Sequence, residues 1–205
     1  ELEFKNFLSR FQDKGEQVKA EEAFQKVEEL DLAEEIFQKA EEKEEIGLEV
    51  LEEGDAFLGL ALSWEEDGKP SVYGFLPQGF LTRDYLMEKA ADLCGHGKMV
   101  ASLDIKAMLR HMDIREHTAM FDAGIAAYLL NPLKSQYTYD DIAKEYLGEI
   151  LPAKEDLIGK LTYLKAAKDE AGEKEVVKSI CYMAYVALKA RKPLLEALED
   201  TGMKK

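Results

Sequence analysis

The stretch FDAGIAAYLLNP, residues 121–132, is the segment from which the fold of this chain can be assigned. By pattern it forms a helix, because Asp122 stands where it can cap the first turn and Asn131-Pro132 ends the run. Four apolar residues between these ends are predicted to share one buried face: Ile125, Ala126, Leu129 and Leu130. The pattern therefore predicts packing, and any chemistry has to come from other residues.

The composition bounds the class of protein. The chain has 205 residues, 46% of them apolar, which is enough for one globular core. Its 42 acidic and 27 basic residues give a formal net charge of −15, the wrong sign for a protein that grips a phosphate backbone over a broad face. Residues 1–53 alone hold 18 acidic and 7 basic residues, net −11, so the remainder is nearly balanced.

Cysteine usage and hydropathy indicate the compartment. Cys94 and Cys181 stand in apolar helix-like settings, which predicts buried free thiols in a reducing compartment. No apolar run approaches the roughly 20 residues of a membrane span, and the sequence shows no signal peptide. We therefore expect a cytoplasmic protein with no membrane partner. The chain begins with Glu1 instead of Met, which is consistent with an excised piece of a longer protein.

The order of patterns predicts an α/β layered domain behind an acidic N-terminal segment. Residues 1–45 are assigned to that segment and 46–205 to the domain, and residues 15–45 fit a partly helical stretch or a linker equally well. Short apolar runs between turn residues predict strands over 46–53, 56–64, 71–77 and 99–102. Thr82 and Thr138 are placed to cap helices. Helices are predicted over 82–94, 104–112, 121–130, 138–147, 153–168 and 173–199.

A longer stretch carries a family resemblance. FDAGIAAYLLNPLKSQYTYDDIAKEYLG, residues 121–148, closely resembles part of the 3′→5′ exonuclease domain of bacterial DNA polymerase I, a family A DNA polymerase. LEFKNFLSRF at 2–11 looks like the join after that polymerase's 5′-nuclease part, and LGLALSW at 58–64 looks like the second strand of its exonuclease domain. The resemblance implies an RNase H-like fold, with a mixed sheet of about five strands flanked by helices. It also implies that the polymerase part would begin near Lys205, outside this chain.

The first catalytic motif of that family is not conserved in this sequence. Active domains of this type hydrolyse the 3′-terminal phosphodiester with two divalent metals held by four carboxylates. Their first motif is Asp-x-Glu on the first strand, and Leu48-Glu49-Val50 stands at the matching place. Because side chains alternate along a strand, Leu48 and Val50 are predicted to occupy the ligand positions and Glu49 to face the opposite side. Glu53 and Asp55 have the required spacing but lie at a predicted turn.

The other two motifs are also incomplete. The second places an Asp at the start of the helix after the fourth strand, where the alignment puts Ile105. Asp104, one residue earlier, is predicted to cap the helix and not to bind metal. The third is Tyr-x-x-x-Asp on the last helix, where Ser179 and Met183 stand. Residues 176–195 contain no acidic side chain, so no other register supplies the carboxylate.

The remaining candidate residues favour a structural interpretation. His96, His111 and His117 have no i,i+4 pairing and no cysteine at ligand spacing, so no zinc site is predicted. Five basic residues are candidates for phosphate contact around the cleft that holds the active site in that family: Lys98, Lys106, Arg110, Arg115 and Lys134. Their expected role is nevertheless to form a solvated face.

The sequence thus predicts a catalytically degenerate exonuclease-like domain. It would join the 5′-nuclease and polymerase parts of a parent chain and meet DNA only through that parent, with no cofactor of its own. Two alternatives stay open. An active exonuclease would draw displaced ligands from Asp104, Asp122 and the Glu53/Asp55 pair, and would then need Mg²⁺ or Mn²⁺. A protein-interaction module would instead present the acidic segment 1–53 to a basic partner.

Overall fold

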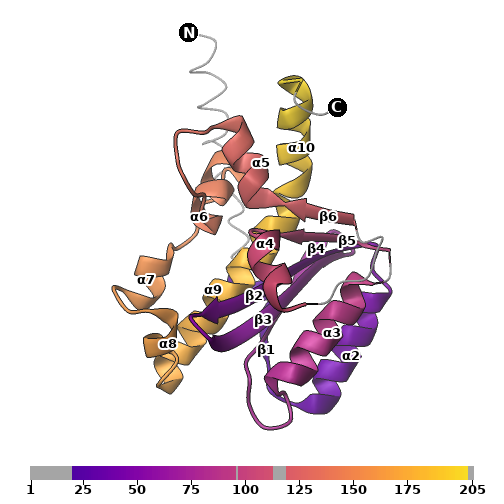
Figure 1. Ribbon diagram of the computed structural model, residues 1–205, viewed down its shortest axis with the longest axis vertical. Helices are drawn as coiled ribbons and strands as arrows, with labels where there is room; N and C mark the ends of the chain where they lie inside the picture. The colour runs from indigo at the N-terminus through magenta and orange to yellow at the C-terminus, as the bar shows by residue number, and fades with distance from the viewer. Residues whose placement is uncertain (1–19, 96, 113–118, 203–205) are drawn as a thin grey trace.

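A six-stranded mixed sheet forms the centre of the molecule (Figure 1). The computed structural model describes residues 20–95, 97–112 and 119–202, so residues 2–11 of the resemblance lie outside the described ranges. The strand order is β1-β4-β3-β2-β5-β6. The strands are β1 (Phe24–Val27), β2 (Glu45–Glu53), β3 (Ala56–Glu66), β4 (Lys69–Phe75), β5 (Met99–Ser102) and β6 (Ala119–Asp122). The predicted α/β fold class is confirmed, with one strand more than the five expected.

Strands β2, β3 and β4 form the antiparallel meander that the sequence predicts. Gly54 turns the chain between β2 and β3 at a φ of 62°. Asp67 and Gly68 turn it between β3 and β4 at φ values of 52° and 75°. Gly adopts these left-handed conformations without steric cost, and Asp tolerates them. The turns therefore fall at Glu53-Gly54-Asp55 and Glu66-Asp67-Gly68.

Three strands run in parallel and end at the same edge of the sheet. β2 pairs in parallel with β5, and β5 pairs in parallel with β6. The chain turns from β5 into α4 (Ile105–Met108) and from β6 into α5 (Ala123–Leu130). The edge where parallel strands have their carboxyl ends is where ligands bind in open α/β sheets. Two of the candidate residues from the sequence, Asp104 and Asp122, lie at this edge.

Helices cover both faces of the sheet (Figure 1). On one face α2 (Leu30–Glu41) and α3 (Arg83–Cys94) lie side by side, and Phe37 stacks on Phe75 of the sheet with ring centroids 5.0 Å apart. The long helix α9 (Glu170–Lys189) packs against the other face. We call these the α2/α3 face and the α9 face. Each buries its own apolar cluster, so both sides of the central strands are apolar.

Glycine allows α9 to lie close to the sheet. A Cβ atom at Gly47 would lie 2.2 Å from Ser63 Oγ and 2.3 Å from the carbonyl oxygen of Ala184 on α9. A Cβ atom at Gly74 would lie 2.8 Å from Val177 Cγ1. The hydroxyl of Ser63 donates a hydrogen bond to the same Ala184 carbonyl at 2.7 Å. Gly47 therefore faces α9, and this contact fixes which residues of β2 share that face.

Part of the acidic N-terminal segment belongs to the fold. Within residues 20–45, β1 pairs in parallel with β4 and α2 packs on the sheet. The structure differs here from the predicted boundary at residue 46, because Val27, Ile36 and Phe37 are buried in the core. The charged residues between them cover the outer side of an amphipathic helix. The helical interpretation, and not the linker, describes this part of the segment.

The C-terminal half contains more breaks than the sequence predicts. The single helix expected over 153–168 is two short helices that separate at Gly159, whose φ is 60°. The long helix expected over 173–199 divides at Ala190, before Pro193. The remaining helical elements are η1 (Ala20–Ala23), η2 (Leu109–His111), α6 (Tyr139–Ile142), the π-helical turn η3 (Ala143–Leu147), α7 (Lys154–Ile158), α8 (Tyr163–Ala166) and α10 (Arg191–Asp200).

Helix α5 presents a different face to the core from the predicted one. The helix begins at Ala123 with Asp122 as its cap, as expected, but residues 119–122 form β6. Ile125 and Leu129, predicted to be buried, are exposed. The buried face consists of three small residues, Ala123, Ala126 and Ala127. Because alanines let α5 pack closely against its neighbours, among them α10 (Figure 1), the larger side chains are left outside.

Two whole-chain predictions can be compared with the structure. Cys94 and Cys181 are buried free thiols, as predicted. Among the described residues, no helix combines the length and the apolar character needed to cross a membrane. The reducing, cytoplasmic compartment stays a prediction.

Candidate functional site

Three carboxylates lie near the carboxyl ends of β5 and β6. Glu49 is on β2, and its side chain contacts Leu103 at the turn that leaves β5. Asp104 follows that turn and caps α4, while Asp122 ends β6 and caps α5. The charges of both aspartates act on Glu49, so the three side chains form one acidic group at this edge of the sheet.

Glu49 is the buried member of the group, with 6% of its surface exposed. Its Oε1 accepts a hydrogen bond from the main-chain N–H of Leu103 at 2.5 Å, and its carboxyl group also bonds to the side chain of Ser102. Burial raises the pKa of Glu49 to about 8, against the lowering effect of these two hydrogen bonds. At neutral pH the side chain is therefore mostly a neutral carboxylic acid.

The two aspartates hold the starts of two helices. Asp122 Oδ1 accepts the main-chain N–H of Ile125 at 2.7 Å, and Oδ2 accepts that of Ile105 at 2.9 Å. Burial raises the pKa of Asp122, although its hydrogen bonds act in the opposite direction. Asp104 Oδ1 accepts the main-chain N–H of Ala107 at 2.8 Å, which is the capping role predicted for it. Both side chains thus satisfy N–H groups that the first helical turn leaves free.

The geometry of this group does not fit a two-metal centre. Mg²⁺ and Mn²⁺ need several converging carboxylate oxygens. Here one oxygen of Glu49, one of Asp104 and both of Asp122 accept main-chain hydrogen bonds. In the part of the chain that the structure describes, no group of three or more His, Cys, Asp or Glu side chains is placed to hold a metal ion.

The face of β2 that meets α9 differs from the prediction. Leu48 lies in the apolar cluster of the α2/α3 face, and Val50 packs against the same cluster. Glu49 pairs with Ala61, which belongs to the cluster of the α9 face. Leu48 and Val50 therefore do not occupy the side of the strand that the prediction gave them. The Asp-x-Glu spacing on the α9 face falls on Gly47 and Glu49, so one carboxylate is kept and the other position is glycine.

The residues aligned with the third motif lie on α9 and carry no charge. Ser179 is fully buried, and its hydroxyl shares a hydrogen bond of 2.7 Å with the phenol of Tyr163. Met183 is partly buried and packs against the cluster of the α9 face. Leu48 and Val50 lie on the other face of the sheet, so they do not share a cluster with Met183.

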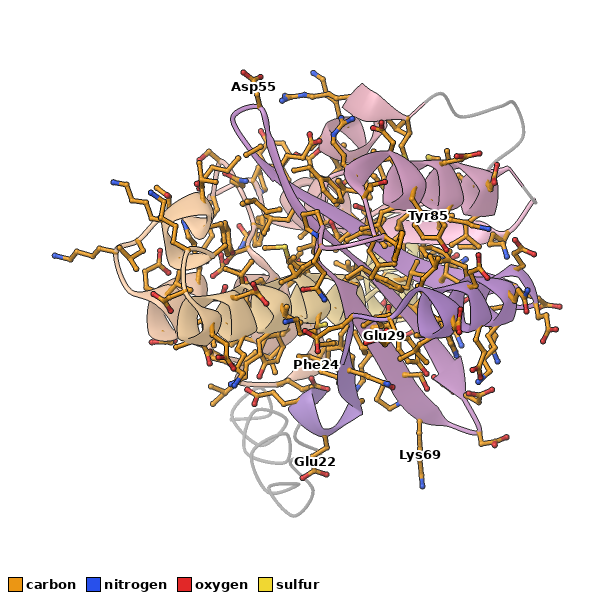
Figure 2. All side chains as sticks on the ribbon, turned by 90° about the horizontal axis from the view of Figure 1, so that it is seen from below. Glu22, Phe24, Glu29, Asp55, Lys69 and Tyr85 are labelled. Atoms are coloured by element: carbon orange, nitrogen blue, oxygen red, sulfur yellow. The ribbon has the colours of Figure 1, made fainter. Side chains whose placement is uncertain are left out.

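Glu53 and Asp55 serve different parts of the structure. Glu53 accepts the main-chain N–H groups of Tyr163 at 3.2 Å and Leu164 at 2.9 Å, which ties β2 to the first turn of α8. Burial opposes ionisation of Glu53, but these hydrogen bonds hold its pKa below the usual value. Asp55 is exposed at the tip of the β2–β3 hairpin and points away from the molecule (Figure 2). The pair does not converge on one ligand.

Two of the basic candidates have structural partners. Lys98 is buried, and its Nζ donates to the carbonyl oxygens of Ala40 at 2.8 Å and Glu41 at 2.9 Å, which caps the C-terminus of α2. Lys134 forms an ion pair with Asp141. Neither side chain is available at the edge where β2, β5 and β6 end.

Lys106 and Arg110 lie beside an open pocket of about 440 Å³ between α4, β6 and α5. Both side chains are exposed at its rim. The rest of the lining is mainly apolar: Ile105, Leu109, Met120, Ile125 and the carboxylate Asp122. The remaining candidates are not placed at this pocket. His96, Arg115 and His117 lie outside the described residues, and His111 is placed only as part of η2.

Sequence reasoning missed the position of Glu49, although one signal was present. A glycine inside a strand often marks a close approach of another element. Gly47 is such a glycine, and period-two alternation places Glu49 on the same face. A Gly-x-Glu spacing at the start of the predicted first strand was therefore the feature that could have identified the α9 face.

The fold is shared with known exonuclease domains. The chain is similar to RNase D of Trypanosoma brucei, with a TM-score of 0.55 and 11% identity over 88% of this chain and 70% of the other. It is similar to the EXO domain of Aedes aegypti Nibbler, with a TM-score of 0.58 and 10% identity over 88% and 91%. For Escherichia coli RNase D, described as an exoribonuclease involved in structured RNA processing, the values are 0.57 and 13% over 88% and 49%.

These similarities bear on the fold alone, since identities of 10–13% carry no assignment of activity. No protein-family model matches the sequence, and no curated protein is significantly similar to it. The chain therefore has the RNase H-like fold of 3′→5′ exonuclease domains.

Proposed function

We propose that this chain is a catalytically inactive exonuclease-like domain of a family A DNA polymerase, where it serves as a structural module between the 5′-nuclease and polymerase parts. The observation that carries the proposal is that the remaining carboxylates bind main-chain N–H groups. Glu49, Asp104 and Asp122 hold the turns after β5 and β6 in place. A carboxylate that satisfies buried N–H donors stabilises the fold and gives little to a metal.

The α9 face supports the same conclusion. A two-metal centre needs carboxylates from the strand and from the helix opposite it. On α9, Ser179 is buried against Tyr163 and Met183 is packed in the apolar cluster. On β2, Gly47 leaves no space for a side chain, since a Cβ atom there would meet the backbone of Ala184. On this proposal Glu49 is the one carboxylate kept on β2, and α9 supplies none at the aligned positions.

The polymerase parent rests on the resemblance of residues 121–148. The parent would supply the partners of this domain, namely its own polymerase and 5′-nuclease parts, and would bring it near DNA in the bacterial cytoplasm during replication and repair. RNase D shares the fold of this chain, and Escherichia coli RNase D is described as an exoribonuclease, so RNA is the substrate class of that neighbour. The degenerate domain would keep that architecture without the reaction.

One observation favours a second candidate, an active exonuclease with displaced ligands. Glu49, Asp104 and Asp122 gather at the edge where active sites of open α/β sheets lie. Rotation of Asp104 away from its cap and entry of a metal would bring carboxylate oxygens together. The hydrogen bonds that this would break make it the less favoured candidate.

A nuclease assay separates the two candidates. The chain is incubated with single-stranded DNA and RNA labelled at the 5′ end, in Mg²⁺ or Mn²⁺, beside an active 3′→5′ exonuclease as the control. We expect no shortening from the 3′ end. Metal-dependent shortening that disappears in both Asp104→Asn and Asp122→Asn would overturn the proposal. In the full parent polymerase, the same substitutions are expected to leave the rate of misincorporation unchanged.

The interaction-module alternative is tested by limited proteolysis. If the acidic segment docks on a basic partner, adding that partner protects sites within residues 1–53 from cleavage. Residues 20–45 are already folded against the sheet, so we expect slow cleavage there without any partner. Fast cleavage within 20–45 that a basic protein suppresses would favour the interaction module over the structural one.

A further inference from the structure

One tyrosine of α9, Tyr182, contacts two parts of the chain that lie far apart in the sequence. Its ring stacks on that of Tyr139 of α6, with centroids 5.6 Å apart and planes at 3°. Phe24 of β1, which lies beside α9 (Figure 2), meets the same ring edge-on with centroids 4.9 Å apart. The hydroxyl of Tyr182 donates to Oε1 of Glu21 at 2.5 Å. Tyr182 is buried, so its position depends on these neighbours.

Residues 20–27, which comprise η1 and β1, are attached to the rest of the fold at its edge. We call them the latch. β1 is the edge strand of the described sheet and pairs with β4. Lys26 pairs with Glu173 in the first turn of α9, and Glu21 lies 3.7 Å from Nζ of Lys178. Partly exposed ion pairs of this kind stabilise little. The latch can therefore separate from the core at a lower free energy than global unfolding requires.

A second segment, residues 149–158, lies between two glycines. We call it the cover. It contains α7, which packs against α9 (Figure 1). The cover is bounded by Gly148 and Gly159, whose φ values are 67° and 60°. Glycine adopts such conformations without a steric clash, so the chain can turn at both positions. Within the cover, the carbonyl oxygen of Pro152 accepts a hydrogen bond of 2.6 Å from the phenol of Tyr139.

We infer that the latch holds the cover closed on α9 through the stack of Tyr182 on Tyr139. Release of the latch removes Glu21 and Phe24 from Tyr182, whose ring is then free to turn. Tyr139 thereby loses the ring that positions its hydroxyl, and the hydrogen bond to Pro152 weakens. The cover then opens about its two glycines. Packed side chains that join two movable segments carry coupling of this kind.

Opening of the cover exposes part of α9 that the closed structure buries. Tyr163, just after the cover, is buried and shares its hydrogen bond with Ser179 of α9. The start of the cover is held separately, because Glu149 accepts hydrogen bonds from Tyr185 and Lys189. The part that opens is therefore α7 and the residues beside it. This inference concerns the chain's own opening and does not rest on the proposed function, so the nuclease assay leaves it unchanged.

Amide hydrogen exchange of the full chain, followed by mass spectrometry, tests the coupling. Phe24→Ala should speed exchange in the cover about tenfold and leave α2 and α3 within about twofold of the wild type. Tyr73→Ala is the matched control. Tyr73 packs on Trp64 with centroids 4.9 Å apart, and both belong to the cluster of the α2/α3 face. The control removes an aromatic ring from the other side of the sheet, so exchange in the cover should stay unchanged.

Two further variants locate the coupling at Tyr182. Coupling free energies are reciprocal, so Tyr139→Leu should speed exchange in the latch. In a Tyr182→Leu background, Phe24→Ala should have no further effect on the cover, because the ring that joins them is gone. Tyr182→Phe keeps both ring contacts and removes the hydrogen bond to Glu21. It should speed exchange in the cover by about threefold.

Three outcomes would overturn the inference. Faster exchange of Phe24→Ala that is confined to the latch and β4 would make the latch a local edge with no effect on the cover. Equal acceleration in every element would mean that global unfolding carries the effect. An undiminished effect of Phe24→Ala in the Tyr182→Leu background would place the coupling elsewhere. Should Phe24→Ala fail to fold, Tyr182→Phe decides, since exchange in its cover has to exceed that of the wild type.

Discussion

Glu49 and Leu103 are joined by a hydrogen bond of 2.5 Å from the main-chain N–H of Leu103 to Oε1 of Glu49. The bond runs from β2 to the turn after β5, its parallel neighbour. It uses the carboxylate that is best placed, on the α9 face, to act as a ligand. The same side chain is buried and has a pKa raised to about 8. The role of Glu49 can therefore be measured through the stability of the fold at different pH values.

Substitution Glu49→Gln should remove a pH-dependent part of the stability. The pKa of Glu49 is raised from 4.5 to about 8 in the folded state, so the neutral form stabilises the fold. This contribution is complete below about pH 4.5 and is lost as the pH rises through about 8. Gln keeps the acceptor for Leu103 and stays neutral. We expect it to be more stable than the wild type at pH 9, by on the order of 2–4 kcal/mol.

Urea unfolding at pH 5, 7 and 9 checks this expectation. Glu65→Gln serves as the control, because Glu65 is exposed on the neighbouring strand β3. The wild type and the control should lose stability between pH 5 and pH 9 more steeply than Glu49→Gln. Parallel curves for all three proteins would show that Glu49 does not change its protonation on unfolding.

Substitution of Gly47 should destabilise the fold and should not create a nuclease. A Cβ atom there would lie within 2.3 Å of two atoms, Ser63 Oγ and the Ala184 carbonyl oxygen. Gly47→Ala should therefore cost about 2 kcal/mol or more, because α9 has to move away from the sheet. Gly47→Asp would restore the Asp-x-Glu pattern with Glu49, yet it should be less stable still and show no metal-dependent cleavage.

Thermal unfolding and the nuclease assay measure these two effects. Gly95→Ala is the comparison, since its Cβ atom would meet only carbonyl oxygens of its own helix, the nearer at 3.3 Å. It should cost clearly less than Gly47→Ala. A stable Gly47→Asp variant that shortens DNA in Mn²⁺ would show that one carboxylate was the only missing part.

The hydroxyl of Ser179 and the phenol of Tyr163 should stabilise the fold as a pair. Both groups are buried and share a hydrogen bond of 2.7 Å. Ser179→Ala should cost about 1–3 kcal/mol, because the Tyr163 hydroxyl is left without this partner. Tyr163→Phe added to it should cost little more. A double-mutant cycle in urea gives the coupling directly, and additive losses would mean that the bond contributes nothing.

Lys98 should act as a structural lysine and not as a contact for phosphate. Its Nζ donates to the carbonyl oxygens of Ala40, Glu41 and Lys43, which end α2. Lys98→Met keeps the length of the side chain but leaves these acceptors unpaired, so we expect a loss of roughly 1–3 kcal/mol. The exposed Lys160 provides the control, Lys160→Met, which should be close to neutral. Similar unfolding midpoints for the two variants would contradict the capping role.

Much of the fold could be predicted from local chemistry. The meander follows from its turn residues, and two predicted caps are present. Thr82 accepts the N–H of Tyr85 at 3.2 Å, and Thr138 and Asp141 form a capping box. These signals were readable because each depends on a few neighbouring residues. Strands β1 and β6 were missed because each has only four residues, too few for a period to be detected. β1 also lies among many charged residues.

The candidate site was harder to predict, because it depends on which face of a strand meets which helix. Leu48, Val50 and Leu51 are all apolar, so alternation along β2 does not distinguish the α2/α3 face from the α9 face. The close contact of Gly47 with Ala184 decides between them, and it joins residues far apart in the sequence. The same holds for α5, whose buried face is set by its packing against its neighbours and not by its own hydrophobicity.

Asp122 bonds to the first residue of α4 through one carboxylate oxygen and to the first turn of α5 through the other. This side chain therefore joins the starts of the two helices that border the pocket, together with the hydrogen bond from the Gly124 N–H to the Leu103 carbonyl oxygen at 3.1 Å. A ligand that wedges between them would have to pull one of these bonds apart, so the width of the pocket is set before anything enters it. The shape that this pocket accepts would then depend on Asp122, a lining residue whose carboxylate oxygens are already engaged in hydrogen bonds.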